Sequence, residues 1–383
     1  MTVSYTLSTL NAISELDEQD WNGCLSDDHP FVSHAFLKAL EESGSATAET
    51  GWMPYHLVLR RDADQSVAGV APLYVKGHSQ GEYVFDHSWA HAYERAGGRY
   101  YPKLQLSVPF SPVTGPRFLV PKGPDEAERK ALLASGAKQI AIKLGLSSVH
   151  ATFLREEDLA AARELGYLIR TGEQFHWVNE GYENFDDFLT ALSSRKRKAI
   201  RKERREANEQ GLEFETLSGD QITPLHWDAF FSFYMDTGSR KWGTPYLTRA
   251  FFDQIGETLG DQIVLFMVKN AGRYIAGALN FQSRDCLYGR YWGCTEDHKF
   301  LHFETCYYRA IDYAIAHGIN RVEAGAQGPH KLARGYLPTR TFSAHWMQDP
   351  GFHDAVAEFL KAETRDMDAE IQYMNRFTPF KKT

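Results

Sequence analysis

An internal repeat constrains this sequence more than any other feature. Val67-Ala68-Gly69 aligns with Ile275-Ala276-Gly277, and Leu57-Val58-Leu59 aligns with Leu265-Phe266-Met267 at the same spacing. Within each copy, the two segments read as the two strands of a β-hairpin, because short apolar runs flank polar turn residues. Self-similarity of this kind indicates that one supersecondary unit has been duplicated.

A second match lies at the far end of the same unit. Gly166-Tyr167-Leu168, followed by His176-Trp177, aligns with Gly335-Tyr336-Leu337, followed by His345-Trp346, again with identical internal spacing. The offset differs from that of the hairpins because the first copy carries a longer loop. Matches at both ends of a unit, in the same order, predict two tandem copies of one fold.

The clearest copy runs from Ile263 to Trp292 and reads as three antiparallel strands. Asn270-Ala271-Gly272 forms the first turn, where positive φ is required, and Arg284-Asp285 forms the second. A helix-length segment, Phe303 to His317, and a strand, Arg321 to Ala324, follow. Strand alternation places Tyr288, Arg290 and Trp292 on one face and Tyr291 on the other.

The first copy is expected to use Glu82 to Trp89 as its third strand. The stretch 91–124 follows as a long loop, and its prolines argue against regular helix or a central strand. We place the domain boundary after residue 178, giving domains 1–178 and 179–383. A basic helix over 185–210 opens the second domain, capped by Asn184 and stopped by Gly211.

Composition indicates a globular protein and excludes several classes. The 383 residues are 43% hydrophobic and 13% aromatic, which is enough to build two cores. The formal net charge of −8 argues against a DNA-binding protein. The N-terminus shows no signal peptide, and no segment approaches the ~20 apolar residues of a membrane span. The four cysteines have no metal-ligand spacing, so we expect reduced thiols and a soluble, cytoplasmic protein.

Four segments of the sequence resemble the tandem-GNAT acyltransferases of the Fem type: SRKRKAIRKERREANEQG, FYMDTGSRKWGTPYLTRAFF, IAGALNFQSRDCLYGRYWG and RVEAGAQGPHKLARGYLP. More narrowly, they resemble the bacterial predicted N-acyltransferases linked to peptidoglycan biosynthesis or recognition. The resemblance covers nearly the whole chain. It implies an α/β (α+β) fold of two tandem GNAT-like domains, with mixed, mostly antiparallel sheets flanked by helices, and transfer of an acyl or aminoacyl group to an amine.

The sequence departs from acetyl-CoA enzymes of this fold at the phosphate-binding turn. A glycine-rich turn follows the third hairpin strand in those enzymes, whereas Thr295 to His302 contains no glycine and two acids; Arg95 to Gly98 is only a partial match. This difference favours aminoacyl-tRNA as the donor, although acyl-CoA stays open. Either donor would be a co-substrate, and no tightly bound cofactor is expected. The acceptor would be the amine of a small molecule or precursor.

Amine acylation requires a base that removes a proton from an ammonium group. Glu323, on the strand after the helix, is the first candidate, with Glu304 and His302 behind it; Tyr336 is a candidate acid, or a core residue like its counterpart Tyr167. A second set of polar and aromatic side chains is predicted to bind substrate. It comprises Tyr288, Arg290, Trp292, Gln327, His330, Lys331, Arg334, Arg240, Lys241 and Trp242.

The run from Arg195 to Arg205 holds eight cations in eleven positions. Such density suits a phosphate contact, either on tRNA or on a nucleotide-linked precursor, unless the run is a solvated helix matched by neighbouring glutamates. The residues predicted to bind phosphate are Arg195, Arg197, Lys198, Arg201 and Lys202.

Two further groups of residues leave alternatives open. His298 with His302, and His87 with His91, stand four apart, but no third ligand accompanies either pair, so no metal site is predicted. In the long loop, an aromatic and basic set could line an acceptor groove or simply pack in the core; it consists of Tyr100, Tyr101, Phe110 and Arg117.

Two other functions compete with a Fem-like transferase. A duplicated fold can lose catalysis, so the chain could be a binding module for a cell-wall precursor or a protein partner. A third possibility is an acetyl-CoA-dependent N-acetyltransferase with unusual phosphate contacts.

Overall fold

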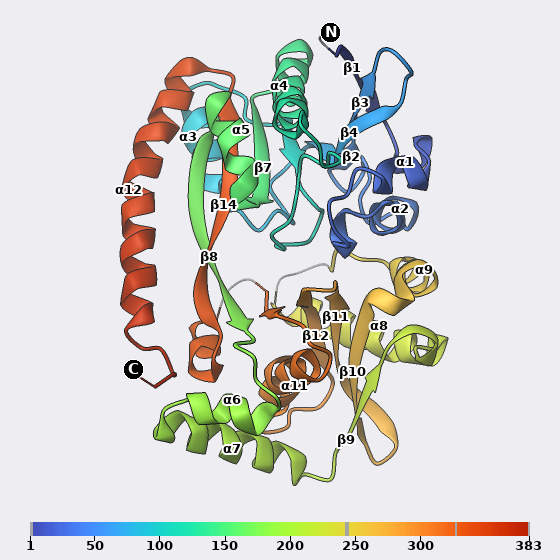
Figure 1. Ribbon diagram of the computed structural model, residues 1–383, viewed down its shortest axis with the longest axis vertical. Coiled ribbons are helices and arrows are strands. Elements are labelled where there is room, and N and C mark those ends of the chain that lie inside the picture. The colour runs from blue at the N-terminus through green and yellow to red at the C-terminus, as the bar shows by residue number, and fades with distance from the viewer. Residues whose placement is uncertain (1–2, 242–244, 326–327, 382–383) are drawn as a thin grey trace. The chain divides into compact units, whose positions relative to one another are not determined.

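The computed structural model describes residues 3–241, 245–325 and 328–381. The chain divides into two compact units, each with mixed strands flanked by helices (Figure 1). Unit 1 comprises Met1–Gly172 and Arg340–Asp368, and unit 2 comprises Glu173–Thr339 and Ala369–Thr383. The units therefore interleave in sequence, whereas the predicted domains, 1–178 and 179–383, were contiguous.

Unit 1 contains a small antiparallel sheet in the order β1-β3-β4 and a second set in the order β2-β5-β6-β7-β14, in which β6 and β7 are parallel. The strands are β1 (Tyr5–Leu10), β2 (Trp52–Pro54), β3 (His56–Arg61), β4 (Val67–Ala71), β5 (Leu73–Lys76), β6 (Lys103–Leu106), β7 (Ser148–Leu154) and β14 (Leu337–Met347).

The helices of unit 1 cover an apolar core formed by Leu57, Leu104, Leu133 and Val149 among others. Helix α2 begins where Ser33 accepts a hydrogen bond from the Phe36 amide, and α4 ends at Gly145, which adopts the left-handed conformation. The helices are α1 (Glu18–Asn22), α2 (His34–Glu42), α3 (His87–Arg95), α4 (Glu126–Leu144), α5 (Leu159–Glu164) and α12 (Pro350–Asn375), the last of which runs on into unit 2.

The third strand of the first copy lies elsewhere than predicted. Residues Glu82 to Asp86 form no strand, and α3 begins at His87. β6, inside the loop thought unable to hold a central strand, takes the position between β5 and β7. Lys103–Leu106 itself contains no proline and all of its residues are buried, so the prolines on either side do not interrupt its pairing.

Unit 2 has the strand order β8-β13-β12-β11-β10-β9, in which β12 and β13 are parallel and the other pairs antiparallel. The predicted three-stranded unit is confirmed, and Ala271 and Gly272 supply the positive φ of its first turn. The strands are β8 (Leu168–Val178, beginning in unit 1), β9 (Glu213–Leu217), β10 (Ile263–Asn270), β11 (Arg273–Gln282), β12 (Cys286–Cys294) and β13 (Arg321–Glu323).

The basic helix of unit 2 is broken in two at Leu192–Ser193, where the chain is extended. A π-helical turn, Glu304–Tyr308, interrupts the helix that packs on β12 and β13. No helix in the described part of the chain is long and apolar enough to span a membrane. The α-helices are α6 (Phe185–Ala191), α7 (Ser194–Asn208), α8 (Pro224–Lys241), α9 (Arg249–Leu259), α10 (Leu301–Phe303) and α11 (Arg309–Ala316).

The last strand of the chain completes the first unit. In β14, His345 is paired with His150 of β7, and Met347 packs with Trp89, Val356 and Leu360 in a separate apolar cluster of unit 1. Backbone pairing and this buried cluster explain why residues 340–368 leave unit 2.

Candidate functional site

Two parallel strands of unit 2 part from each other at Glu323. β12 and β13 are in register from Cys286–Arg321 to Tyr288–Glu323, where β13 ends. β12 continues to Cys294 in pairing with β11, and no strand of the described residues pairs with its other side beyond Tyr288. The two strands are thus no longer paired beyond Glu323.

A β-bulge at Arg290 changes which side chains share a face of β12. The pairing of β12 with β11 skips Arg290, and such an extra residue reverses the alternation beyond it. The prediction that Tyr288 and Trp292 share a face is therefore wrong. Trp292 lies on the helix-covered face, where its ring centroid is 5.2 Å from that of His302.

Glu323 is buried at the last register position of the parallel pair. Its Oε1 accepts a hydrogen bond from Nε of Arg321 at 3.1 Å. Its Oε2 has no hydrogen-bond donor among the described residues, and Nε2 of His176 lies 4.0 Å away. Because burial lowers the pKa of His176, that imidazole is neutral near pH 7 and does not neutralise the carboxylate. Glu323 therefore keeps one oxygen that can accept a proton.

Glu304 and Tyr336 are both engaged in the core of unit 2. The buried Glu304 carboxylate accepts hydrogen bonds from Nε and a terminal nitrogen of Arg204, each at 3.1 Å. The Tyr336 hydroxyl donates to the Tyr307 carbonyl at 3.2 Å, and burial raises its pKa well above the usual value. These contacts favour structural roles for the two residues, and for Tyr336 they match the alternative drawn from Tyr167.

His302 and His330 meet on the helix-covered face of the sheet, opposite Glu323. The His302 Nε2 atom lies 3.3 Å from the Tyr307 hydroxyl, which lies 2.9 Å from Nε2 of His330. The Cys306 thiol lies 3.5 Å from Nδ1 of His302. Leu287 and Val322, which alternate with Tyr288 and Glu323, pack in the same cluster as Tyr307, so the two candidate bases stand on opposite faces.

Two cations stand beside these rings, on the 3-10 helix η7 (Pro329–Arg334). Burial lowers the pKa of Lys331 to about 8, and its ammonium donates to the Gly325 carbonyl at 3.0 Å. The Arg334 guanidinium lies 3.4 Å from the Phe303 ring centroid and donates to Glu203 at 2.9 Å. Lys331 is thus a cation that can lose its charge near neutral pH, whereas Arg334 also ties η7 to α7.

The cations at the start of α7 differ from those farther along it. Arg201 pairs with Asp186, and Lys202 with Glu206. For Arg195, Arg197 and Lys198, no carboxylate among the described residues lies within ion-pair distance. Cations in the first turns of a helix oppose its dipole, so an anion is the group that would stabilise them. Tyr308 and Arg334 both donate to Glu203 of α7.

Four predicted substrate-binding residues cannot be placed by their side chains. Gln327 and Trp242 lie outside the described residues, and Arg240 and Lys241 are placed only as backbone at the end of α8.

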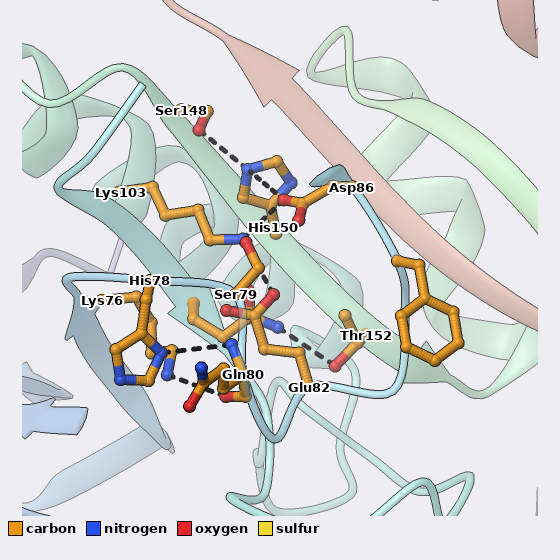
Figure 2. Close-up of polar contacts among 12 residues, drawn as sticks. Lys76, His78, Ser79, Gln80, Glu82, Asp86, Lys103, Ser148, His150 and Thr152 are labelled. Carbon is orange, nitrogen blue, oxygen red and sulfur yellow. Dashed lines mark hydrogen bonds and ion pairs between the residues drawn. The ribbon is translucent and has the colours of Figure 1, made fainter. Parts of the chain in front are cut away.

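Unit 1 contains a buried ionic cluster that was not predicted from the sequence (Figure 2). The Lys103 ammonium, fully buried in β6, donates to Ser79, Glu82 and Asp86 at 2.8, 2.8 and 2.5 Å. Burial raises the pKa of Glu82 to about 7 and lowers that of Lys76 to about 7. Glu82 and Lys76 therefore both titrate near pH 7, although burial shifts their pKa values in opposite directions.

A chain of neutral rings continues from this cluster. The Tyr100 hydroxyl donates to Asp86 at 2.6 Å and lies 3.3 Å from Nε2 of His150. The Nδ1 atoms of His150 and His345 are 2.7 Å apart, so one ring donates and the other accepts. Burial lowers the pKa of His150 to about 3, which keeps the ring uncharged.

The cluster was missed because its members come from the segment assigned to a strand and from the long loop. An available signal was Lys103 itself, since a lysine within an otherwise buried strand requires an anionic partner. Of the loop residues left open, Tyr100 and Tyr101 join this cluster, Tyr101 through Ser79 at 2.8 Å. Phe110 packs on Trp52, and Arg117 is buried among backbone carbonyls, so these two are packing residues.

Comparison with known proteins places the chain in a family. A model of FemAB-like proteins, described as peptidoglycan biosynthesis/recognition, matches residues 12–382. The chain belongs to the FemAB-like family. No curated protein matches the sequence.

Solved structures share the fold of this FemAB-like chain at low sequence identity. FemX is 14% identical with a TM-score of 0.56, and the match covers 92% of this chain and 100% of FemX. L-PGS from Bacillus licheniformis is 10% identical with a TM-score of 0.52, covering 88% and 98%. The C-terminal domain of a putative lysylphosphatidylglycerol synthetase from Agrobacterium fabrum is 10% identical with a TM-score of 0.56, covering 92% and 97%. The predicted fold of GNAT-like tandem units is thereby confirmed.

Proposed function

We propose that this FemAB-like protein is an N-acyltransferase that moves an acyl or aminoacyl group from an activated donor to an amine of a peptidoglycan precursor. The family description names peptidoglycan, and this chain has a fold similar to those of FemX and L-PGS. The chemistry is assigned to unit 2, where the parallel strands diverge.

The observation that carries the proposal is the position of Glu323. It is a buried carboxylate at the point where β12 and β13 part, and its Oε2 has no donor among the described residues. An acceptor amine enters as an ammonium ion and is not nucleophilic until it loses a proton. Glu323 removes this proton, and the neutral amine attacks the acyl carbonyl of the donor. The bond between the acyl carbon and the donor's oxygen or sulfur breaks, the leaving group takes up one N–H proton of the attacking amine, and an amide forms.

Two features favour aminoacyl-tRNA over coenzyme A as the donor. The cations at the start of α7 have no described carboxylate partner and suit a phosphate backbone. In the loop before α10, Glu296 accepts hydrogen bonds from Asn270 at 2.9 Å and from Arg273 at 3.2 Å. A fixed carboxylate at that position repels a pyrophosphate, which normally binds glycine-rich amides there.

The test is a transfer assay with separate donors, alanyl-tRNA and acetyl-CoA, and a nucleotide-linked muramyl peptide as acceptor. We expect amide formation with alanyl-tRNA, and a loss of turnover of about 10²-fold or more in Glu323→Gln. The thermal midpoint of this near-isosteric variant should stay close to that of the wild type, because the amide oxygen of glutamine can still accept the hydrogen bond from Arg321, although the charge of that ion pair is lost. Unchanged turnover in Glu323→Gln would remove it from the mechanism, and binding without transfer would identify a binding module.

Salt dependence tests the phosphate contact independently. Replacement of Arg195, Arg197 and Lys198 by glutamine should weaken tRNA binding and flatten its dependence on salt concentration, since fewer counterions are released. Arg205→Gln is the matched control, because Arg205 lies on the same helix and faces Glu209 at 3.8 Å. Equal salt slopes for the triple variant and the wild type would exclude α7 from tRNA binding.

A further inference from the structure

A cysteine and a histidine lie together in the helix beside the diverging strands. The Cys306 thiol is 3.5 Å from Nδ1 of His302, and both side chains are half-buried, so small molecules can reach them. They are four residues apart, and Cys306 falls within the π-helical turn Glu304–Tyr308. Such turns are rare and occur frequently at functional sites, because the widened backbone reorients side chains.

One arrangement of protons satisfies the whole chain of contacts from Cys306. The thiol donates to Nδ1 of His302, whose Nε2–H donates to the Tyr307 oxygen at 3.3 Å. The Tyr307 hydroxyl then donates to Nε2 of His330 at 2.9 Å. Nucleophile, base and a third group that orients the base are the parts that activate a thiol in covalent catalysis. Burial raises the pKa of Tyr307, so its hydroxyl stays a neutral partner.

Polar and charged groups from two elements lie near Cys306. Its own helix contributes His302 and Tyr307, and η7 contributes His330, Lys331 and Arg334, of which Arg334 is paired with Glu203. Lys331 and Cys306 interact electrostatically, although burial is the larger influence on Lys331.

The other cysteines lie outside the π-helical turn. Cys24 and Cys286 are buried, and burial raises the pKa of the Cys24 thiol to about 12 and that of Cys286 well above its usual value. Cys294 is half-exposed like Cys306 but lies at the end of β12. It therefore provides an internal reference of similar exposure outside the π-helical turn.

We infer that Cys306 is a nucleophile that carries the acyl group as a thioester between donor and amine, with His302 as its base. This inference rests on the proposed acyl transfer. Cys306 gives its proton to His302 and attacks the donor carbonyl, and the bond to the leaving group breaks as that group takes the proton from His302. The acceptor amine then attacks the thioester, the C–S bond breaks, and His302 returns the amine's proton to the sulfur. An amide and the free thiol result.

Glu323 lies on the opposite face of these strands, so within this scheme His302 handles the protons exchanged with sulfur, and the acceptor reaches the thioester as the free amine. Tyr307 is a positioning residue, because it orients His302 and accepts the hydrogen bond of the imidazolium. His330 continues the same chain through the Tyr307 hydroxyl.

The test uses the full chain and p-nitrophenyl acetate, a small activated ester. We expect a burst of p-nitrophenolate and one acetyl group on the Cys306 peptide by mass spectrometry. Cys306 should be acetylated about 10²-fold faster than Cys294, and His302→Gln should remove this advantage. Tyr307→Phe should raise the pH midpoint of Cys306 acetylation, since the imidazolium loses an acceptor; a purely structural Tyr307 would leave that midpoint in place.

Transfer assays separate this inference from the proposed function. Loss of amide formation in Cys306→Ser, with Cys294→Ser at the wild-type rate, would support the thioester. Wild-type amide formation in Cys306→Ser, or equal acetylation of Cys306 and Cys294, would overturn it and leave the proposed transferase intact. Acetylation of Cys306 in a protein that acylates no amine would support the nucleophile while refuting the proposed function.

Discussion

The two units place different side chains at corresponding positions of their sheets. In unit 1, Gln105 of β6 is in register with His150 of β7, which faces His345 of β14. In unit 2, Tyr288 is in register with Glu323, which faces His176 of β8. The internal repeat aligns His176 with His345, so both units have a histidine on the last of these strands. On the strand beside it, His150 in unit 1 corresponds to Glu323 in unit 2.

The polar groups of the two units also differ in exposure. Around His150 the ionic groups Lys103, Glu82 and Asp86 are all at most 3% exposed and pair with one another. In unit 2, His302 is half-buried and His330 is exposed. A closed, mutually paired cluster suits a role in specifying the fold, whereas accessible groups suit chemistry on a substrate. We therefore assign stability to the polar groups of unit 1 and catalysis to those of unit 2.

The largest expected effect is on Lys103. Lys103→Met leaves two buried carboxylates without their cation, and breaking such a pair costs about 3–5 kcal/mol. We expect a decrease of this size in the free energy of unfolding, measured by urea titration.

Lys331→Met is the matched variant in unit 2. The Lys331 ammonium donates to the Gly325 carbonyl, and burial already lowers its pKa to about 8, so we expect a loss of about 1 kcal/mol and a clear fall in turnover. If Lys103→Met abolished turnover without destabilising the protein, the division of roles between the units would be wrong.

Glu82 should make stability depend on pH in an unusual direction. Its pKa is raised by burial from 4.5 to about 7, so the folded state holds the proton more tightly than the unfolded state. The stability that this proton contributes is complete below pH 4.5 and is lost as pH rises through 7, with a slope of up to about 1.4 kcal/mol per pH unit. Urea titrations of wild type and Glu82→Gln across this range measure the difference.

Glu82→Gln should remove that slope. The neighbouring Lys76 does not mask it, because its pKa is lowered to about 7 and its contribution falls as pH decreases from 10.5 through 7. An identical pH dependence of wild type and Glu82→Gln between pH 4.5 and 7 would show that Glu82 is not the group that titrates.

Sequence patterns predicted best where local rules decide the structure. The hairpins of β10, β11 and β12 follow from apolar runs and a turn that requires positive φ, and the family resemblance supplied the fold. The bulge at Arg290 could not be predicted, because one extra residue within a strand leaves its composition unchanged. The return of β14 to unit 1 depends on pairing between distant segments, which local patterns do not encode.

The candidate site was predicted only in part, because some of its contacts also join segments that are distant in the sequence. Glu323 could be placed because it ends a short strand after a helix. Glu304 stood behind it as a second candidate, and only the position of Arg204, far away in the sequence, shows that its oxygens are engaged. Cys306 lies 3.5 Å from His302 within a π-helical turn, and no residue pattern in that segment predicts such a local distortion.

The smallest expected effect concerns the two aligned tyrosines, which should behave alike. The Tyr167 hydroxyl donates to the Ala134 carbonyl at 2.8 Å, and the Tyr336 hydroxyl donates to the Tyr307 carbonyl at 3.2 Å, each inside its own core. Replacement by phenylalanine removes one buried hydrogen bond, so each variant should lose about 1 kcal/mol of unfolding free energy.

Measurement of kcat tests whether Tyr336 and Tyr167 have the same role. Burial raises the pKa of both hydroxyls, which makes each a poor proton donor to a substrate, and the two donate to backbone carbonyls. We therefore expect both Tyr336→Phe and Tyr167→Phe to keep the kcat of the wild type. A pronounced loss of kcat in Tyr336→Phe alone, with matched stability, would restore Tyr336 as the general acid and make the tyrosines another position at which the units have diverged.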